Sequence, residues 1–193
     1  KKYMIKEKIS KLREKIKDNH IDGYIIPHND SFFNESLPKA NKRLEWLTSF
    51  DGSAGTLLVL ADKAYLFVDG RYTIQARQQV DNEIFDIIHL KDKNLYDILN
   101  SIETETSIGI DSKLHSVIDI KNLNLNLKDS HISIKEIKDN LVDLIWDDRP
   151  VLNYHSIKIH KLEYSGQKSE TKIDKVINYI NLQLGDSLII TDC

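Results

Sequence analysis

Two short loops carry the residues of this chain whose types and spacing are best suited to chemistry. The first, residues 51–55, reads Asp-Gly-Ser-Ala-Gly, and the second, residues 69–72, reads Asp-Gly-Arg-Tyr. Asp69 can accept hydrogen bonds from the backbone amides that open a following helix, and it can pair with the planar guanidinium of Arg71. Arginine and tyrosine, as in Arg71 and Tyr72, are also enriched at binding surfaces. The second loop is therefore either a helix cap with an ion pair or part of a cleft or interface.

The first loop matches the common reactive motifs poorly. It lacks the Gly-x-Ser-x-Gly spacing of a serine nucleophile. Its backbone amides could cradle a phosphate, but phosphate loops lead into helices, whereas this loop leads into an apolar, strand-like run. The sequence contains no His-Glu-x-x-His, and His155 and His160 would point in different directions on a helix. We therefore assign no catalytic residue and no metal ligand, and we retain as candidates for substrate access or an interface Asp51, Gly52, Ser53, Asp69, Arg71 and Tyr72.

A β-hairpin is predicted to hold the two loops. Residues 56–60 and 64–68 are short apolar runs separated by the turn-like residues 61–63, so each loop lies at an outer end of the hairpin. An amphipathic helix over residues 3–19 and a short buried strand over residues 24–27 precede it.

The segment between that strand and the hairpin has two parts. Residues 28–40 are polar and lack a period, so they predict a surface loop, in which Phe32 and Phe33 either anchor the loop to the core or line a pocket. Residues 41–49 predict a short helix with Leu44 and Leu47 facing inward.

Helices and strands alternate after the hairpin. A stripe of Leu141, Leu144 and Ile145 predicts a helix that Pro150 ends. The order of the elements predicts an α/β fold, with a mixed, largely parallel sheet flanked by helices. The other predicted elements are helices over residues 71–80, 95–102 and 116–126 and strands over residues 84–90, 107–110 and 131–134.

A domain boundary is predicted near residue 150. Residues 151–169 lack a sustained period and are interpreted as a linker. A helix over residues 173–184, with Gly185 as its cap, and an apolar strand over residues 187–191 then repeat the order of the first 27 residues. One helix and one strand bury too little surface to be stable alone. We therefore interpret residues 1–150 as one domain and residues 151–193 as the truncated start of a second, related domain of a longer protein.

Composition excludes several classes of protein. The 193 residues are 40% hydrophobic and 30% charged, which is typical of a soluble globular protein. A formal net charge of −3 gives no indication of nucleic-acid binding, and no stretch is apolar enough to span a membrane. A single cysteine, Cys193, excludes an internal disulfide and suits a reducing, cytoplasmic location.

Four segments together resemble the N-terminal region of the Xaa-Pro aminopeptidase (aminopeptidase P) family, most closely its three-domain form. Tyr164-Ser165-Gly166 and the helix after it also resemble the start of that form's second domain. The four segments are residues 43–56 (RLEWLTSFDGSAGT), residues 68–72 (VDGRY) with Gln75-Ala76, residues 109–111 (GID) and residues 140–150 (NLVDLIWDDRP).

The resemblance implies a creatinase-type N-terminal domain followed by the beginning of a second domain of related fold. In that family a C-terminal domain performs the chemistry, with two Asp, one His and two Glu holding two divalent ions, usually manganese, for attack on the peptide bond before proline. None of those ligand motifs occurs in residues 1–193, so the segment alone is expected to be catalytically silent and without its own cofactor.

The resemblance also implies a role in shape. The N-terminal domain of such enzymes helps to form a homodimer and restricts the active site to peptides with a free N-terminus and proline at the second position. The loops at residues 51–55 and 69–72 are expected nearest to that surface.

Three hypotheses follow. The first is the non-catalytic N-terminal part of a cytoplasmic, metal-dependent Xaa-Pro aminopeptidase. A prolidase or creatinase relative shares the fold, although residues 146–150 favour the three-domain aminopeptidase. A non-enzymatic binding or scaffold module is the alternative of another class. Continuation of the gene beyond Cys193 into a region with the five metal ligands would distinguish the enzymes from the scaffold.

Overall fold

Alternating hydrophobic residues build a central sheet whose two faces are both buried. In the strand β1 (Gly23–Pro27), Tyr24 and Ile26 contribute to one core, and Ile25 contributes to the other, because successive side chains of a strand point to opposite faces. The computed structural model describes residues 2–152 and 156–190. It divides the chain into one unit up to Leu152 and a second unit from residue 153.

The sheet of the first unit has six strands in the order β4-β3-β2-β1-β5-β6. β1 pairs antiparallel with β2, and β2 pairs antiparallel with β3, while β1 with β5, β5 with β6 and β3 with β4 are parallel pairs. Five strands therefore run in one direction, and β2 alone is reversed. The predicted mixed, largely parallel sheet is confirmed. The remaining strands are β2 (Thr56–Leu60), β3 (Ala64–Val68), β4 (Asp86–His89), β5 (Thr106–Ile110) and β6 (Ile132–Glu136).

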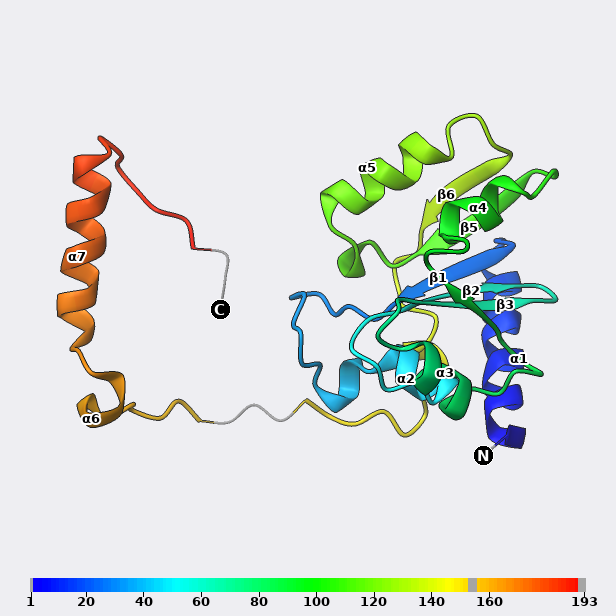
Figure 1. The fold of residues 1–193 in the computed structure, drawn as a ribbon, viewed down its shortest axis with the longest axis horizontal. Coiled ribbons are helices and arrows are strands. Elements are labelled where there is room, and N and C mark those ends of the chain that lie inside the picture. The colour runs from blue at the N-terminus through cyan, green and yellow to red at the C-terminus, as the bar shows by residue number, and fades with distance from the viewer. Residues whose placement is uncertain (1, 153–155, 191–193) are drawn as a thin grey trace. The chain divides into compact units, whose positions relative to one another are not determined.

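Helices cover both faces of this sheet (Figure 1). One face carries α1 (Lys2–Asp18), α2 (Arg43–Thr48) and α3 (Thr73–Gln79). The other face carries α4 (Leu95–Asn100) and α5 (Val117–Asn126). Each of α4 and α5 begins with a capping box, which satisfies otherwise unpaired amides of the first turn. Short 3-10 turns lie at η1 (Lys39–Asn41), η2 (Ser112–Leu114) and η3 (Asp143–Ile145).

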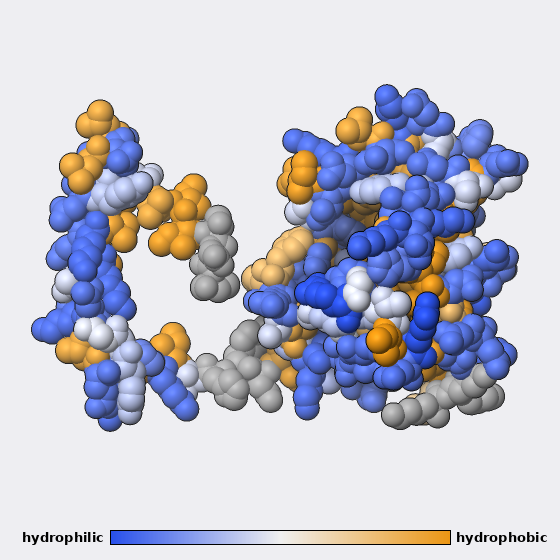
Figure 2. Space-filling model, in the orientation of Figure 1, coloured by the Kyte–Doolittle hydropathy of each residue, from blue (hydrophilic) through white to orange (hydrophobic). Residues whose placement is uncertain are grey.

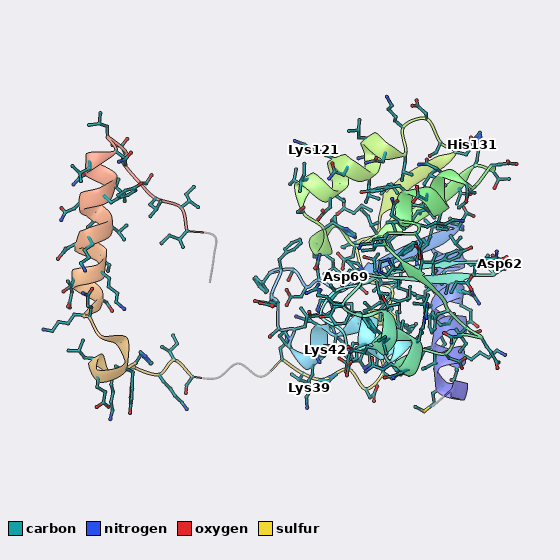
Figure 3. The ribbon with its side chains drawn as sticks, in the orientation of Figure 1. Lys39, Lys42, Asp62, Asp69, Lys121 and His131 are labelled. Carbon is teal, nitrogen blue, oxygen red and sulfur yellow. The ribbon has the colours of Figure 1, made fainter. Side chains whose placement is uncertain are left out.

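Because five strands run in the same direction, their carboxyl ends lie together along one side of the sheet. We call this side, where those strands end, the carboxyl edge. The β2–β3 turn lies at the opposite edge, so Asp62 in that turn and Asp69 after β3 lie at opposite ends of the hairpin (Figure 3). The loop over residues 51–55 enters β2 from the carboxyl edge because β2 is reversed. Both candidate loops therefore lie at the same edge.

The prediction of a helix over residues 140–150 is wrong. Only η3 forms there, and Leu144 is 52% exposed, whereas Val142, two residues earlier, is buried. The Asn140 side chain accepts hydrogen bonds from the amides of Val142 and Asp143, which gives the backbone an alternative to a regular helix. The hydrophobic residues that enter the core are Leu141, Val142, Ile145 and Trp146.

The second unit contains two helices in its described part, α6 (Leu162–Ser165) and α7 (Ser169–Leu182). The linker prediction missed α6. Gly185 was predicted as the cap of the helix over residues 173–184, but α7 ends at Leu182 with Gln183 at its C-cap position, and the residue in the left-handed region is Leu184, with φ of 55°. Hydrophobic residues are exposed at the C-terminal end of α7 and in the segment that follows it (Figure 2).

The strand predicted over residues 187–191 does not form over residues 187–190, and Thr191 lies outside the described residues. A strand needs a hydrogen-bonded neighbour, and the described residues of this unit supply none.

Candidate functional site

Direct hydrogen bonds join the two candidate loops. The hydroxyl groups of Ser53 and Tyr72 lie 2.6 Å apart, so a residue of the first loop contacts a residue of the second. Asp51 Oδ1 accepts hydrogen bonds from the side-chain amides of Gln75 and Gln79 on α3, at 2.6 and 2.7 Å. Gln79 in turn accepts a hydrogen bond from the Asp51 backbone amide at 3.1 Å. The two loops and one side of α3 thus form one connected surface, which we call the rim.

An ion pair organises the second loop of the rim. The Asp69 carboxylate accepts from Arg71 Nη2 at 2.7 Å, from Arg71 Nε at 3.1 Å and from the Arg71 backbone amide at 2.9 Å. These hydrogen bonds hold the pKa of Asp69 below its usual value and raise the pKa of Arg71. The helix α3 begins at Thr73 and has Tyr72 at its N-cap position, so Asp69 closes a turn and does not cap the helix. The predicted ion pair is confirmed, and the cap is corrected to a turn.

The aromatic ring of Tyr72 is held from two sides. It packs edge-on against Phe50, with ring centroids 5.6 Å apart, and the Arg71 guanidinium lies 5.1 Å from its centre. The hydrogen bond with Ser53 lowers the pKa of the Tyr72 hydroxyl. Gly52 is required beside this cluster, since a Cβ at that position would come within 2.2 Å of the Phe50 ring. The rim is therefore a preformed surface of the fold.

A cavity of about 240 Å³ opens beside the first loop of the rim. Burial lowers the pKa of His28 on its wall, and the nearby charge of Lys42 lowers it further. His28 Nε2 is buried and has no hydrogen-bond partner among the described residues. Sequence reasoning missed this cavity, because its walls come from the loop after β1, from α2 and from residues 51–53. The only sequence signal was the polar run that follows Pro27.

The phenylalanines of the loop after β1 do not anchor it to the core. Phe32 is 78% exposed and Phe33 is 47% exposed, and neither lines a described cavity. The buried carboxylate of Asp30 holds the loop instead, by accepting hydrogen bonds from the backbone amides of Phe32 and Asn34 and from the side-chain amides of Asn34 and Asn41.

The described residues also bear on metal binding and on membranes. Within residues 2–152 and 156–190, no group of three or more His, Cys, Asp or Glu side chains is placed to hold a metal ion. None of the helices in this described part is long and apolar enough to cross a bilayer. The rim therefore presents hydrogen-bonding and ionic side chains, with no metal-ligand cluster in the described part of the chain.

Comparison with known proteins gives a consistent result. The family model described as "Creatinase/Prolidase N-terminal domain" matches residues 8–141. A probable Xaa-Pro aminopeptidase P from Laccaria bicolor is 32% identical over 96% of this chain and 29% of its own length. A second, from Coccidioides posadasii, is 33% identical over 86% of this chain and 28% of its own length. The chain thus spans less than a third of the length of these relatives.

Solved structures show the same fold. An X-prolyl aminopeptidase from Caenorhabditis elegans, described as a cytosolic enzyme with a di-nuclear active site, aligns with a TM-score of 0.81 and 25% identity. That alignment covers 93% of this chain and 31% of the enzyme. The N-terminal domain of the cytoplasmic peptidase PepQ from Mycobacterium tuberculosis aligns with a TM-score of 0.57 and 23% identity, over 72% of this chain and 98% of that domain.

Proposed function

Because this chain belongs to the creatinase/prolidase N-terminal domain family, we propose that it is the N-terminal part of a metal-dependent Xaa-Pro aminopeptidase. The parent protein would remove an N-terminal residue that precedes proline. The 193-residue segment would shape substrate access and contribute to a homodimer without performing the chemistry.

One observation carries this proposal. Similarity to an Xaa-Pro aminopeptidase P extends over 96% of the chain at 32% identity, beyond residue 141, where the match to the family model ends. Residues after the first domain are therefore also similar to that class of enzyme. This favours an aminopeptidase P parent, with the second unit as the start of a further domain of the same protein.

The metal would belong to another part of the parent protein. Its two divalent ions, which we propose are manganese, would activate water for attack on the peptide bond. The described residues contain no suitable ligand group, and a structural neighbour is described as a di-nuclear enzyme. That neighbour is also described as cytosolic, which supports a cytoplasmic location for the parent.

The rim is the surface we propose for access control. The Arg71 side chain is 67% exposed even though Asp69 pairs with it, and its third nitrogen, Nη1, has no partner among the described residues. An exposed ion pair contributes little to folding, because water already solvates both groups well. Arg71 is therefore available to contact a peptide or a neighbouring domain.

Activity of the parent protein tests the proposal. The full-length protein should cleave peptides with proline at the second position and should lose that activity when a chelator removes its metal. The 193-residue segment should be inactive under both conditions. Failure of the metal-loaded parent to cleave any such peptide would contradict the enzyme assignment and would favour a binding module.

The role of Arg71 is tested in the same full-length protein. Arg71→Ala is expected to lower kcat/KM while the melting temperature stays close to that of the wild type. The matched control is Arg77→Ala, which removes an exposed arginine of α3. It should change neither kcat/KM nor the melting temperature. A lower melting temperature with unchanged turnover per folded molecule would show that Arg71 serves only to hold Asp69.

A further inference from the structure

A second cavity, of about 290 Å³, lies where the chain leaves neighbouring parallel strands toward opposite faces of the sheet. The segment after β1 leads to α2 on one face, and the segment after β5 leads to α5 on the other (Figure 1). In open α/β sheets, ligands bind in the crevice that such a divergence creates at the carboxyl ends of the strands. The walls come from the segments after β1, β5 and β6, and the residues that matter here are Asp30, Arg43, Asp111, Lys113, Lys138 and Asp143.

The buried carboxylates of this crevice are already satisfied. Asp30, only 1% exposed, accepts four hydrogen bonds. Asp111 accepts hydrogen bonds from the Lys113 backbone amide at 3.1 Å and from the Asn140 side chain at 2.9 Å. Asp143 is paired with two arginines, at 2.7 Å to Arg43 and 2.6 Å to Arg149. These carboxylates therefore leave little capacity to bind a cation.

The guanidinium of Arg43 retains one unpaired nitrogen, Nη1, which carries two N–H donors. Its Nε and Nη2 donate to Asp143 at 2.7 and 2.8 Å. The Arg43 residue is only 7% exposed, and its Nη1 atom is buried without a hydrogen-bond partner in the described part of the chain. Buried donors without partners are rare in folded proteins, so Arg43 leaves a hydrogen-bonding need unmet in the wall of this crevice.

Cations also predominate among the unpaired groups at the mouth of the crevice. The ammonium groups of Lys113 and Lys138 are exposed and have no partner among the described residues. Asp139 is the one carboxylate of the lining without a compensating donor in the same described part. The free groups are thus one buried guanidinium edge and two lysines against a single carboxylate. Four carboxylates and three cations line the crevice in all, so it is the free donors, and not the net charge, that favour a ligand with good hydrogen-bond acceptors such as carboxylate oxygens.

We propose that this crevice binds a small carboxylate-bearing molecule, with its carboxylate on Arg43 Nη1 and its outer part near Lys113 and Lys138. The volume is close to the lower limit for ligand pockets, which suits a compound the size of a small organic acid. The proposal concerns the first unit alone and does not depend on the peptidase role. An ordered water molecule on Arg43 Nη1 is the competing explanation.

Nuclear magnetic resonance of the 193-residue chain tests this proposal, with succinate as the probe. Succinate should shift the amide signals of residues 30–34, 111–114 and 138–144 in a saturable way, with a dissociation constant on the order of 1 mM. Succinamide, which has the same skeleton without charge, should cause no saturable shift at matched ionic strength.

Two lysine variants locate the site without disturbing the core. Lys113→Gln should weaken succinate binding about two- to fivefold, as expected for loss of one partly solvated charge. Lys93→Gln removes an exposed lysine beyond β4 and should leave the affinity unchanged. Equal shifts with succinamide, equal weakening in both variants, or no saturable shift at these residues would overturn the proposal and leave a water-filled crevice.

Discussion

Removal of the Asp143 carboxylate should be among the most destabilising single changes in the first unit. Asp143 accepts two hydrogen bonds from the buried guanidinium of Arg43 and one contact from Arg149, and it lies 100 positions from Arg43 in the sequence. Asp143→Ala would leave the Arg43 charge buried without a counter-ion. Breaking a buried ion pair in this way costs about 3–5 kcal/mol. Asp143 is itself 23% exposed on its side chain, so water can reach it and we expect about 3 kcal/mol.

That loss is a large fraction of the stability of a typical domain, which is about 5–15 kcal/mol. Tryptophan fluorescence in urea is a suitable assay, because both tryptophans of the chain, Trp46 and Trp146, belong to the first unit. Their rings stack at 5.0 Å, so their emission will report directly on packing of residues 140–149 against α2. A loss of about 3 kcal/mol should lower the melting temperature by roughly 6–12 °C.

Two further variants make the measurement decisive. Asp139→Ala removes a nearby exposed carboxylate and should change the free energy of unfolding by less than about 0.5 kcal/mol. The double variant Arg43→Leu/Asp143→Leu removes both charges of the buried pair and should recover much of the loss, since only the more exposed Arg149 then lacks its partner. A loss below about 1 kcal/mol in Asp143→Ala would refute the reasoning and would show that water solvates Arg43.

Three other predictions concern stability. Thr48→Val should cost about 1–3 kcal/mol in urea unfolding, because the buried Thr48 hydroxyl accepts from the Phe50 amide, which would lose its partner; a neutral result would contradict it. Burial opposes ionisation of Asp30, but its hydrogen bonds hold the pKa below the usual value. The folded-state pKa is therefore depressed, so the stabilisation is present above about pH 4 and is lost as the pH falls further. Asp30→Asn should flatten that decline in a pH series, and an unchanged slope would exclude Asp30 as its source. A chain ending at Leu152 should melt within a few degrees of the 193-residue chain, as measured by calorimetry, whereas a fall of many degrees would show that the second unit supports the first.

Local patterns predicted the elements that depend on local sequence. The hairpin over residues 56–60 and 64–68 has the observed bounds, because alternation and turn residues fix both strands. The prediction that one side of the first helix is buried is confirmed, as is the burial of Leu44 and Leu47. The strand predicted over residues 84–90 is longer than the observed β4. β4 is an edge strand, and it extends only as far as its pairing with β3.

Long-range pairing explains what local patterns missed. In residues 140–149 the local turn at Asn140 is accompanied by long-range contacts of Asp143 with Arg43 and of Arg149 with the backbone of Ala40. No periodicity encodes such pairs. The rim residues were identified from their types, but the two cavities beside the rim and at the β1–β5 divergence depend on which strands are neighbours. That order follows from the fold and cannot be derived from any single segment.

The reversed direction of β2 has a practical consequence for labelling this protein. The exposed turn of residues 61–63 lies at the opposite end of the hairpin from the rim, as the positions of Asp62 and Asp69 show in Figure 3, and none of its residues lines either of the two cavities described above. A fluorophore, an affinity tag or a short inserted peptide placed in this turn would extend away from the carboxyl edge. Such a probe could be used to test for the proposed dimer, or to attach the protein to a surface, while the surfaces proposed for peptide and small-acid binding stay free.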